Sequence, residues 1–292
     1  MAHEQHGGYY LPEPSSWPVT ASAGLFLAAI GAGSWINGLG AGKYILLLGF
    51  LIILYVVVGW FGTVIRENES GLYNEQVDKS FRWGMMWFIF SEVMFFAAFF
   101  GALFYARLLA VPWLGGEGAK FWTHEFLWPN FQASWPLLNP PSPEHYDVPK
   151  GIIETWGVPA LNTVILLSSS VTITWAHWGL KMNQRWKLIL GLIITIALGL
   201  TFLAFQAKEY IHAYHELNLT LHSGIYGTTF FMLTGFHGLH VTLGTIILTV
   251  ILGRAIAGHF KPEDHFGFEA AAWYWHFVDA VWLFLFTFVY WL

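Results

Sequence analysis

Seven long apolar stretches dominate this chain of 292 residues and constrain its fold more than any other feature. A helix that crosses a bilayer core of about 30 Å needs about 20 mostly apolar residues. Seven stretches meet that need: Trp17 to Leu39, Tyr44 to Ile65, Trp83 to Leu109, Val158 to Leu180, Leu188 to Ala207, Gly224 to Gly253 and Phe266 to Leu292. Barrel strands alternate over about 10 residues, so these continuous runs predict an all-α integral membrane protein with seven transmembrane helices.

Composition excludes several classes of protein. Only 11% of residues are charged, against roughly 25% in soluble domains. The net charge of -5 comes without any run of Lys or Arg, which indicates that nucleic acid is not a partner. The chain has 0 Cys, which excludes disulfides, thiolate metal sites and cysteine nucleophiles.

The distribution of basic residues predicts the orientation in the membrane. The first sixteen residues contain no Lys or Arg, so they do not resemble a signal peptide and the first span is expected to be retained. With the N-terminus inside, the short outer loops receive only Lys43 and Lys208. The short inner loops receive Arg66, Lys79, Arg82, Lys181, Arg185, Lys187, Arg254 and Lys261. The positive-inside rule therefore predicts a cytoplasmic N-terminus and an external C-terminus.

Five polar residues are expected at membrane depth, where ionisable groups are costly and usually have a function. Glu92 follows Arg82 by about ten residues, which places it roughly 15 Å deep at about 1.5 Å per residue. The same reasoning places the other four near the middle of the sixth and seventh spans: His237, His240, His276 and Asp279. We expect these residues to form an intramembrane polar cluster.

Each of these polar groups has a structural explanation beside a functional one. Glu92 is either a proton-relay carboxylate or a neutral acid that bonds across helices. His237 and His240 share a helix face and could hold a metal, although hydrogen-bonded buried histidines are commoner. His177 is interpreted as an interfacial residue. Towards the outer side, a set of Glu209, His212 and Glu216 could chelate a cation or simply be solvated. We predict no metal site and no catalytic residue in this chain.

Basic residues at the inner ends of the spans suggest contacts with lipid. Arg66, Arg82, Arg254 and His259 lie where apolar stretches end. They are either topology anchors or ligands of anionic phospholipid head groups.

Four motifs resemble one known family. SEVMFFAAFF surrounds Glu92, and LNTVILLSSSVTITWAHW begins at Leu161. GTTFFMLTGFHGLHV begins at Gly227, and HFGFEAAAWYWHFVDAVWLFLF begins at His265. Together they resemble subunit III of cytochrome c oxidase, a member of the haem-copper oxidase complex, over nearly the whole chain.

The resemblance implies a fold in which seven helices form a V of two-helix and five-helix bundles. The expected organisation is an N-terminal cytoplasmic segment 1–16, a two-helix arm 17–75 and a five-helix arm 76–292 with an external loop at about 111–157. It also implies a lipid-filled cleft between the arms. As implied by the family, subunits I and II are the partners and carry haem and copper, cytochrome c is the donor, and phospholipid is bound. This chain would be a non-redox subunit that supports subunit I and its proton uptake.

Two alternatives stay open. One is subunit III of a quinol oxidase, although those relatives often lack the first two spans. The other is a stand-alone proton-coupled transporter that uses Glu92 and His240 as a relay. The expected location is the bacterial inner membrane, with the mitochondrial inner membrane as the alternative.

Overall fold

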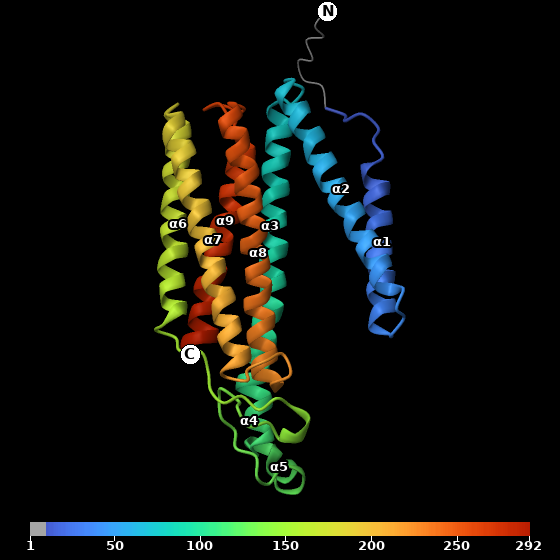
Figure 1. Ribbon diagram of the computed structural model, residues 1–292, viewed down its shortest axis with the longest axis vertical. Coiled ribbons are helices and arrows are strands. Elements are labelled where there is room, and N and C mark those ends of the chain that lie inside the picture. Colours follow the sequence, from blue (N-terminus) through green and yellow to red (C-terminus); the bar gives the residue numbers. More distant parts are fainter. Residues whose placement is uncertain (1–9) are drawn as a thin grey trace, which may run out of the picture. The chain divides into compact units, whose positions relative to one another are not determined.

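The computed structural model describes residues 10–292, and every regular element in this range is helical. Residues 1–9 of the predicted N-terminal segment 1–16 lie outside the described residues. The long helices are α1 (Trp17–Ile36), α2 (Gly42–Glu69), α3 (Glu75–Tyr105), α6 (Val158–Lys181), α7 (Arg185–His215), α8 (Gly224–Ala257) and α9 (Phe266–Leu285) (Figure 1). Each lies in one of the seven spans that are long and apolar enough to cross a membrane. The all-α membrane fold with seven spans is therefore confirmed.

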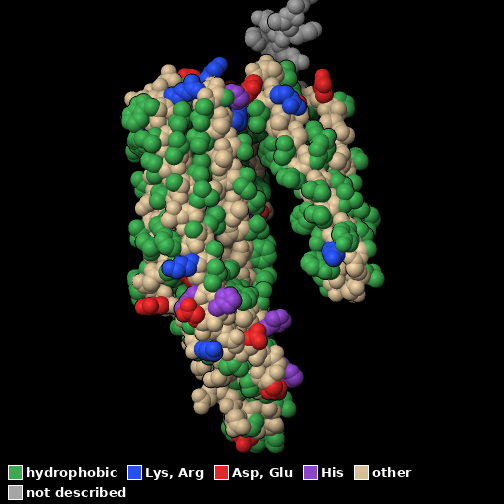
Figure 2. All heavy atoms as spheres, in the orientation of Figure 1, with side chains coloured by type: hydrophobic (Ala, Val, Ile, Leu, Met, Phe, Trp, Pro, Cys, Tyr) green, Lys and Arg blue, Asp and Glu red, His purple; other side chains and the backbone are tan. Residues whose placement is uncertain are grey.

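Contacts divide the chain into two compact units, Met1–Trp83 and Gly84–Leu292, so the division falls inside α3. Within each unit, hydrophobic side chains cover the sides of the helices, while charged side chains gather towards the helix ends (Figure 2). This distribution is the one a bilayer requires, because only the helix ends reach water.

In the first unit, α1 and α2 form a hairpin that packs through glycines. A Cβ at Gly49 would lie 2.5 Å from the backbone nitrogen of Ala28, and one at Gly24 would lie 2.9 Å from Cγ2 of Ile52. Small residues at membrane helix interfaces let two backbones approach closely. Near the end of the hairpin, Tyr73 donates a hydrogen bond of 2.7 Å to Glu67. Burial and then this bond to the carboxylate raise the pKa of Tyr73 above its ordinary value.

In the second unit, two of the largest fully buried side chains are tryptophans of α9 that bond to α6. Trp275 Nε1 donates to Ser169 Oγ and Trp282 Nε1 donates to Thr163 Oγ1, each over 2.9 Å. The hydroxyls of Thr172 and a threonine on α7, Thr195, lie 2.7 Å apart. The polar run of α6 thus serves interhelical hydrogen bonds.

The connection 111–157 belongs to the second unit and is tied to its other segments. It contains α4 (Val111–Leu114) and α5 (Phe121–Leu127). Asn218 Nδ2 donates to the carbonyl of Val148 over 3.0 Å, and Thr220 Oγ1 donates to Asp147 over 2.8 Å. The apolar side chain of Leu137 is buried in the core of the unit. These contacts fix the connection to the segment between α7 and α8.

Candidate functional site

Glu92 on α3 and His240 on α8 form a polar pair between two helices. Glu92 Oε2 lies 2.9 Å from Nε2 of His240, and the two side chains are only 22% and 10% exposed. The other ring nitrogen of His240, Nδ1, lies 2.6 Å from the carbonyl oxygen of Phe236. Since a carbonyl only accepts, Nδ1 carries a proton. One further proton then lies between Nε2 and the carboxyl, held by either partner.

Aromatic side chains surround this pair. The His240 ring lies 5.0 Å from the ring of Phe96 and 6.3 Å from that of Tyr274, measured between centroids. The pair therefore satisfies two polar groups inside an apolar bundle, where an unpaired one would be costly.

His237 does not converge with His240. Its Nε2 donates to the carbonyl of Val278 on α9 over 3.2 Å. Its ring packs against those of Phe202 and Trp282, at centroid distances of 5.6 and 5.1 Å. The two histidines share a helix but bond to different neighbours, so they are not arranged as a metal-binding pair.

His276 and Asp279 belong to a separate set of contacts along α9. Nδ1 of His276 lies 2.7 Å from Oγ of Ser170 on α6. Asp279 is buried, and its carboxylate interacts with the same Ser170 hydroxyl. The five predicted intramembrane residues are thus divided among distinct helix contacts.

The predicted chelating set of Glu209, His212 and Glu216, near the C-terminal end of α7, is also divided. Glu209 Oε1 accepts from the hydroxyl of Tyr290 over 2.7 Å and from Gln206 Nε2 over 3.3 Å, inside the bundle. His212 instead pairs with Glu216 over 3.1 Å on the exposed face. Glu209 is therefore a buried interhelical acceptor, and the other two residues form an ordinary surface pair.

The four basic residues expected to contact lipid have different local partners. Arg66 donates to the hydroxyl of Thr63 over 3.1 Å, and Arg82 pairs with Asp78 over 2.7 Å, both in the first unit. In the second unit, the guanidinium of Arg254 lies 4.7 Å from the ring centroid of Phe260. His259 lies in the same turn after α8, and its backbone N–H donates to the carbonyl of Arg254 over 3.1 Å.

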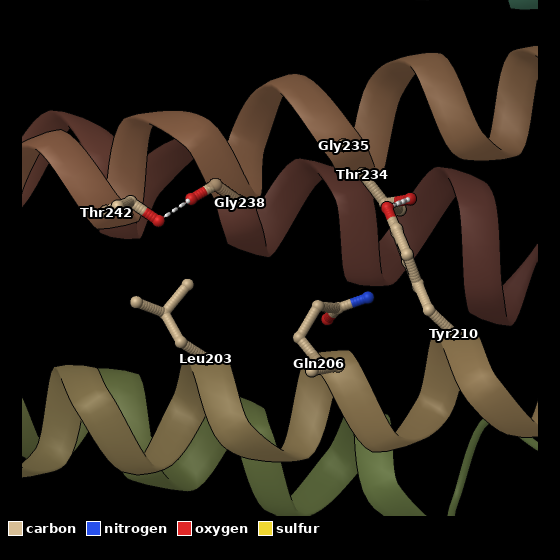
Figure 3. Close-up of a pocket in the computed structure, with 8 residues that line it drawn as sticks. Leu203, Gln206, Tyr210, Thr234, Gly235, Gly238 and Thr242 are labelled. Atoms are coloured by element: carbon tan, nitrogen blue, oxygen red, sulfur yellow. Dashed lines mark hydrogen bonds between the residues drawn. The ribbon is translucent and has the colours of Figure 1, made fainter.

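A shallow groove runs between α7 and α8. Figure 3 shows Leu203 and Gln206 on one side, and Gly238 and Thr242 on the other. Tyr210 crosses it, with its hydroxyl 2.6 Å from Oγ1 of Thr234. Small and hydroxyl-bearing residues make up much of its lining.

The sequence analysis did not predict one group of three side chains that could bind a metal ion. Among the described residues, only His177, His265 and Glu269 bring three possible metal-ligand atoms within 4.8 Å of one another. His265 and Glu269 are four residues apart at the start of α9, and that spacing is visible in the sequence. His177 is 88 residues away from His265, and no local pattern links it to them.

The fold and these interhelical polar contacts define a helical, multi-pass integral membrane protein. The profile of the family described as cytochrome c oxidase subunit III matches residues 6–140 and 142–292. The protein named cytochrome c oxidase subunit 3 from Pongo abelii is 43% identical, and the alignment covers 100% of this chain and 99% of that protein. Those from Scyliorhinus canicula and Latimeria chalumnae are each 42% identical, with the same coverage. The chain belongs to the cytochrome c oxidase subunit III family.

Proposed function

We propose that this chain is an accessory core subunit of a proton-translocating terminal oxidase that passes electrons from cytochrome c to oxygen. The observation that carries the proposal is the full-length match to one family. Subunits I and II of the oxidase are the proposed partners. In this role the chain stabilises subunit I and supports its proton uptake.

The haem and copper of the complex belong to the partner subunits in this proposal. The chain has 0 Cys, so it lacks the thiolates of a binuclear copper centre. His237, His240 and His276 each use ring nitrogens for hydrogen bonds between or along helices. Their contacts support a packing role for these histidines, and in this proposal the chain carries no redox centre.

Phospholipid is the proposed ligand of the basic residues at the inner helix ends. Arg66, Arg82, Arg254 and His259 would contact anionic head groups. A guanidinium is always charged and can donate two parallel hydrogen bonds to a phosphate. The lipids would fill space beside the apolar side chains that these helices expose.

The proposed location is the bacterial inner membrane, with the N-terminus in the cytoplasm and the C-terminus in the periplasm. The asymmetry of Lys and Arg between the loops supports this orientation. The mitochondrial inner membrane is the alternative. The names of the three relatives fit that alternative.

Two alternative functions, a quinol oxidase subunit and a stand-alone transporter, make predictions that differ from those of the proposed function. A quinol oxidase subunit would associate with a complex that does not oxidise cytochrome c. A stand-alone transporter would use Glu92 and His240 as a proton relay, and the 2.9 Å contact between them is the observation that favours it.

Gentle solubilisation distinguishes these functions. The membrane is extracted in mild detergent, and the complexes are separated by native electrophoresis and probed for this chain, for haem absorption and for oxidation of cytochrome c. We expect the chain to migrate with a haem-containing oxidase that oxidises cytochrome c. Migration of the chain alone would contradict the proposal and support the transporter.

A further inference from the structure

The start of α9 and the end of α6 place two imidazoles and a carboxylate around one point. Nε2 of His177 lies 3.3 Å from Nε2 of His265. Glu269 Oε1 lies 3.7 Å from the first nitrogen and 3.6 Å from the second. The three atoms form a nearly equilateral triangle, whose centre is roughly 2 Å from each of them, the length of a zinc–ligand bond.

A hydrogen bond from Nδ1 of His265 leaves a lone pair on Nε2, the ring nitrogen that is close to the other two ligand atoms. Its Nδ1 lies 3.2 Å from the carbonyl oxygen of Lys261. Because the carbonyl only accepts, Nδ1 carries the proton of the neutral ring and Nε2 is left as an acceptor. A second group that fixes the tautomer in this way is typical of metal-binding histidines.

A hydrogen bond between the two imidazoles explains only part of this arrangement. A proton on Nε2 of His177 can be donated to Nε2 of His265 over 3.3 Å. It cannot also bridge to Glu269, whose oxygen lies beyond hydrogen-bond distance of both nitrogens. A cation near the centre, slightly out of the plane of the three atoms, would be within bonding distance of all three.

We propose that His177, His265 and Glu269 form a binding site for a divalent cation of the zinc class. Ligands of a tetrahedral ion at about 2.0–2.1 Å lie roughly 3.3–3.4 Å apart, whereas adjacent ligands of an octahedral ion at that distance lie about 2.9–3.0 Å apart. The measured sides of 3.3, 3.6 and 3.7 Å are closer to the tetrahedral value. Two imidazoles and one carboxylate suit Zn²⁺, while Mg²⁺ and Ca²⁺ prefer oxygen ligands.

The site is only partly buried. The side chains of His177, His265 and Glu269 are 20%, 9% and 13% exposed. An ion can therefore enter from the helix ends, and a water can complete its coordination. The bound ion would fasten the last turns of α6 to the first turn of α9. The sequence interpretation placed no metal in this chain, and this proposal departs from it.

Zinc binding to the full-length chain in lipid nanodiscs tests the site directly. The chain is stripped with a chelator and titrated with Zn²⁺ by calorimetry, and the bound ion is characterised by X-ray absorption. We expect one Zn²⁺ per chain with two imidazoles and oxygen in its shell. His177→Ala, His265→Ala and Glu269→Gln should each weaken binding by more than the roughly 10–100-fold that loss of an outer-shell partner costs.

The matched control is His212→Ala, because His212 and Glu216 form a pair with the same four-residue spacing but no third ligand. This variant should bind Zn²⁺ as the wild type does. Circular dichroism checks that each variant keeps its helices, and Glu269→Gln preserves side-chain volume if an alanine variant fails to fold. Absence of binding by the wild-type chain, or equal binding by wild type and Glu269→Gln, would overturn the proposal.

Discussion

Glu92 and His240 show how one buried contact depends on both of its partners. Each satisfies the other inside the second unit, and the backbone of Phe236 satisfies the remaining ring nitrogen. The functional question is whether the shared proton moves. The structural role of the Glu92–His240 contact does not depend on the answer, because the hydrogen bond exists whichever partner holds the proton.

Substitution of Glu92 separates charge from hydrogen bonding. Glu92→Ala leaves Nε2 of His240 without its partner, so we expect a loss of roughly 1–2 kcal/mol in unfolding free energy. Glu92→Gln can donate or accept and should lie close to the wild type. Unfolding of the purified chain in mixed micelles, followed by circular dichroism, measures both. Equal stability of all three proteins would show that the contact contributes nothing.

At the scale of elements, the glycines of α1 and α2 control how closely the hairpin packs. Gly49→Ala places a methyl group 2.5 Å from the backbone of Ala28, where no flexible side chain can move away. We expect overpacking to cost roughly 1–3 kcal/mol. Gly33→Ala is the matched control on α1, because no atom of another helix lies within 4 Å of its added methyl. Thermal melting of both variants in nanodiscs should show a lower midpoint for Gly49→Ala alone.

Helices could be predicted from sequence because hydrophobic length is a local property. All seven predicted spans coincide with helices, and only their ends differ. The second helix continues from the predicted Ile65 to Glu69, and the third begins at Glu75 instead of Trp83, because a helix can extend past the bilayer with polar residues. The third span continues through α4 to Leu114, beyond the predicted end at Leu109, whereas α5, with 7 residues, is too short to cross a bilayer.

Side-chain partners could not be predicted from the same patterns. The sequence placed Glu92 and His240 at similar depth in an expected polar cluster of five residues, but the direct contact joins only these two. It grouped Glu209 with His212, whereas the Glu209 carboxylate turns into the bundle towards Tyr290. Position on a single helix does not determine which neighbouring helix a side chain faces. The group that His177 forms was missed for the same reason, since its partners His265 and Glu269 lie at the start of α9.

At the scale of the whole molecule, the exposed apolar sides of the helices and the basic residues at their ends are proposed to contact lipid. The V of two arms that the family resemblance implies stays a prediction. We expect Arg66→Ala and Arg254→Ala each to reduce the anionic phospholipid that co-purifies with the chain. Lys208→Ala is the control, because the predicted topology puts Lys208 on the outer side. Native mass spectrometry measures the lipid, and unchanged lipid content in both arginine variants would refute their proposed role.

The central claim is that this chain supports proton uptake and durability of an oxidase without carrying its electrons. Oxygen consumption by the complex, with and without this chain, tests it most directly when followed over many turnovers and at rising pH. A screened surface charge acts only over about 8 Å at physiological salt, so we expect packing and ordered lipid to dominate the effect. We predict a normal initial rate at low pH, a depressed rate at high pH and progressive inactivation when the chain is absent. A complex without it that keeps its full rate at high pH and lasts as long as the intact enzyme would contradict the claim.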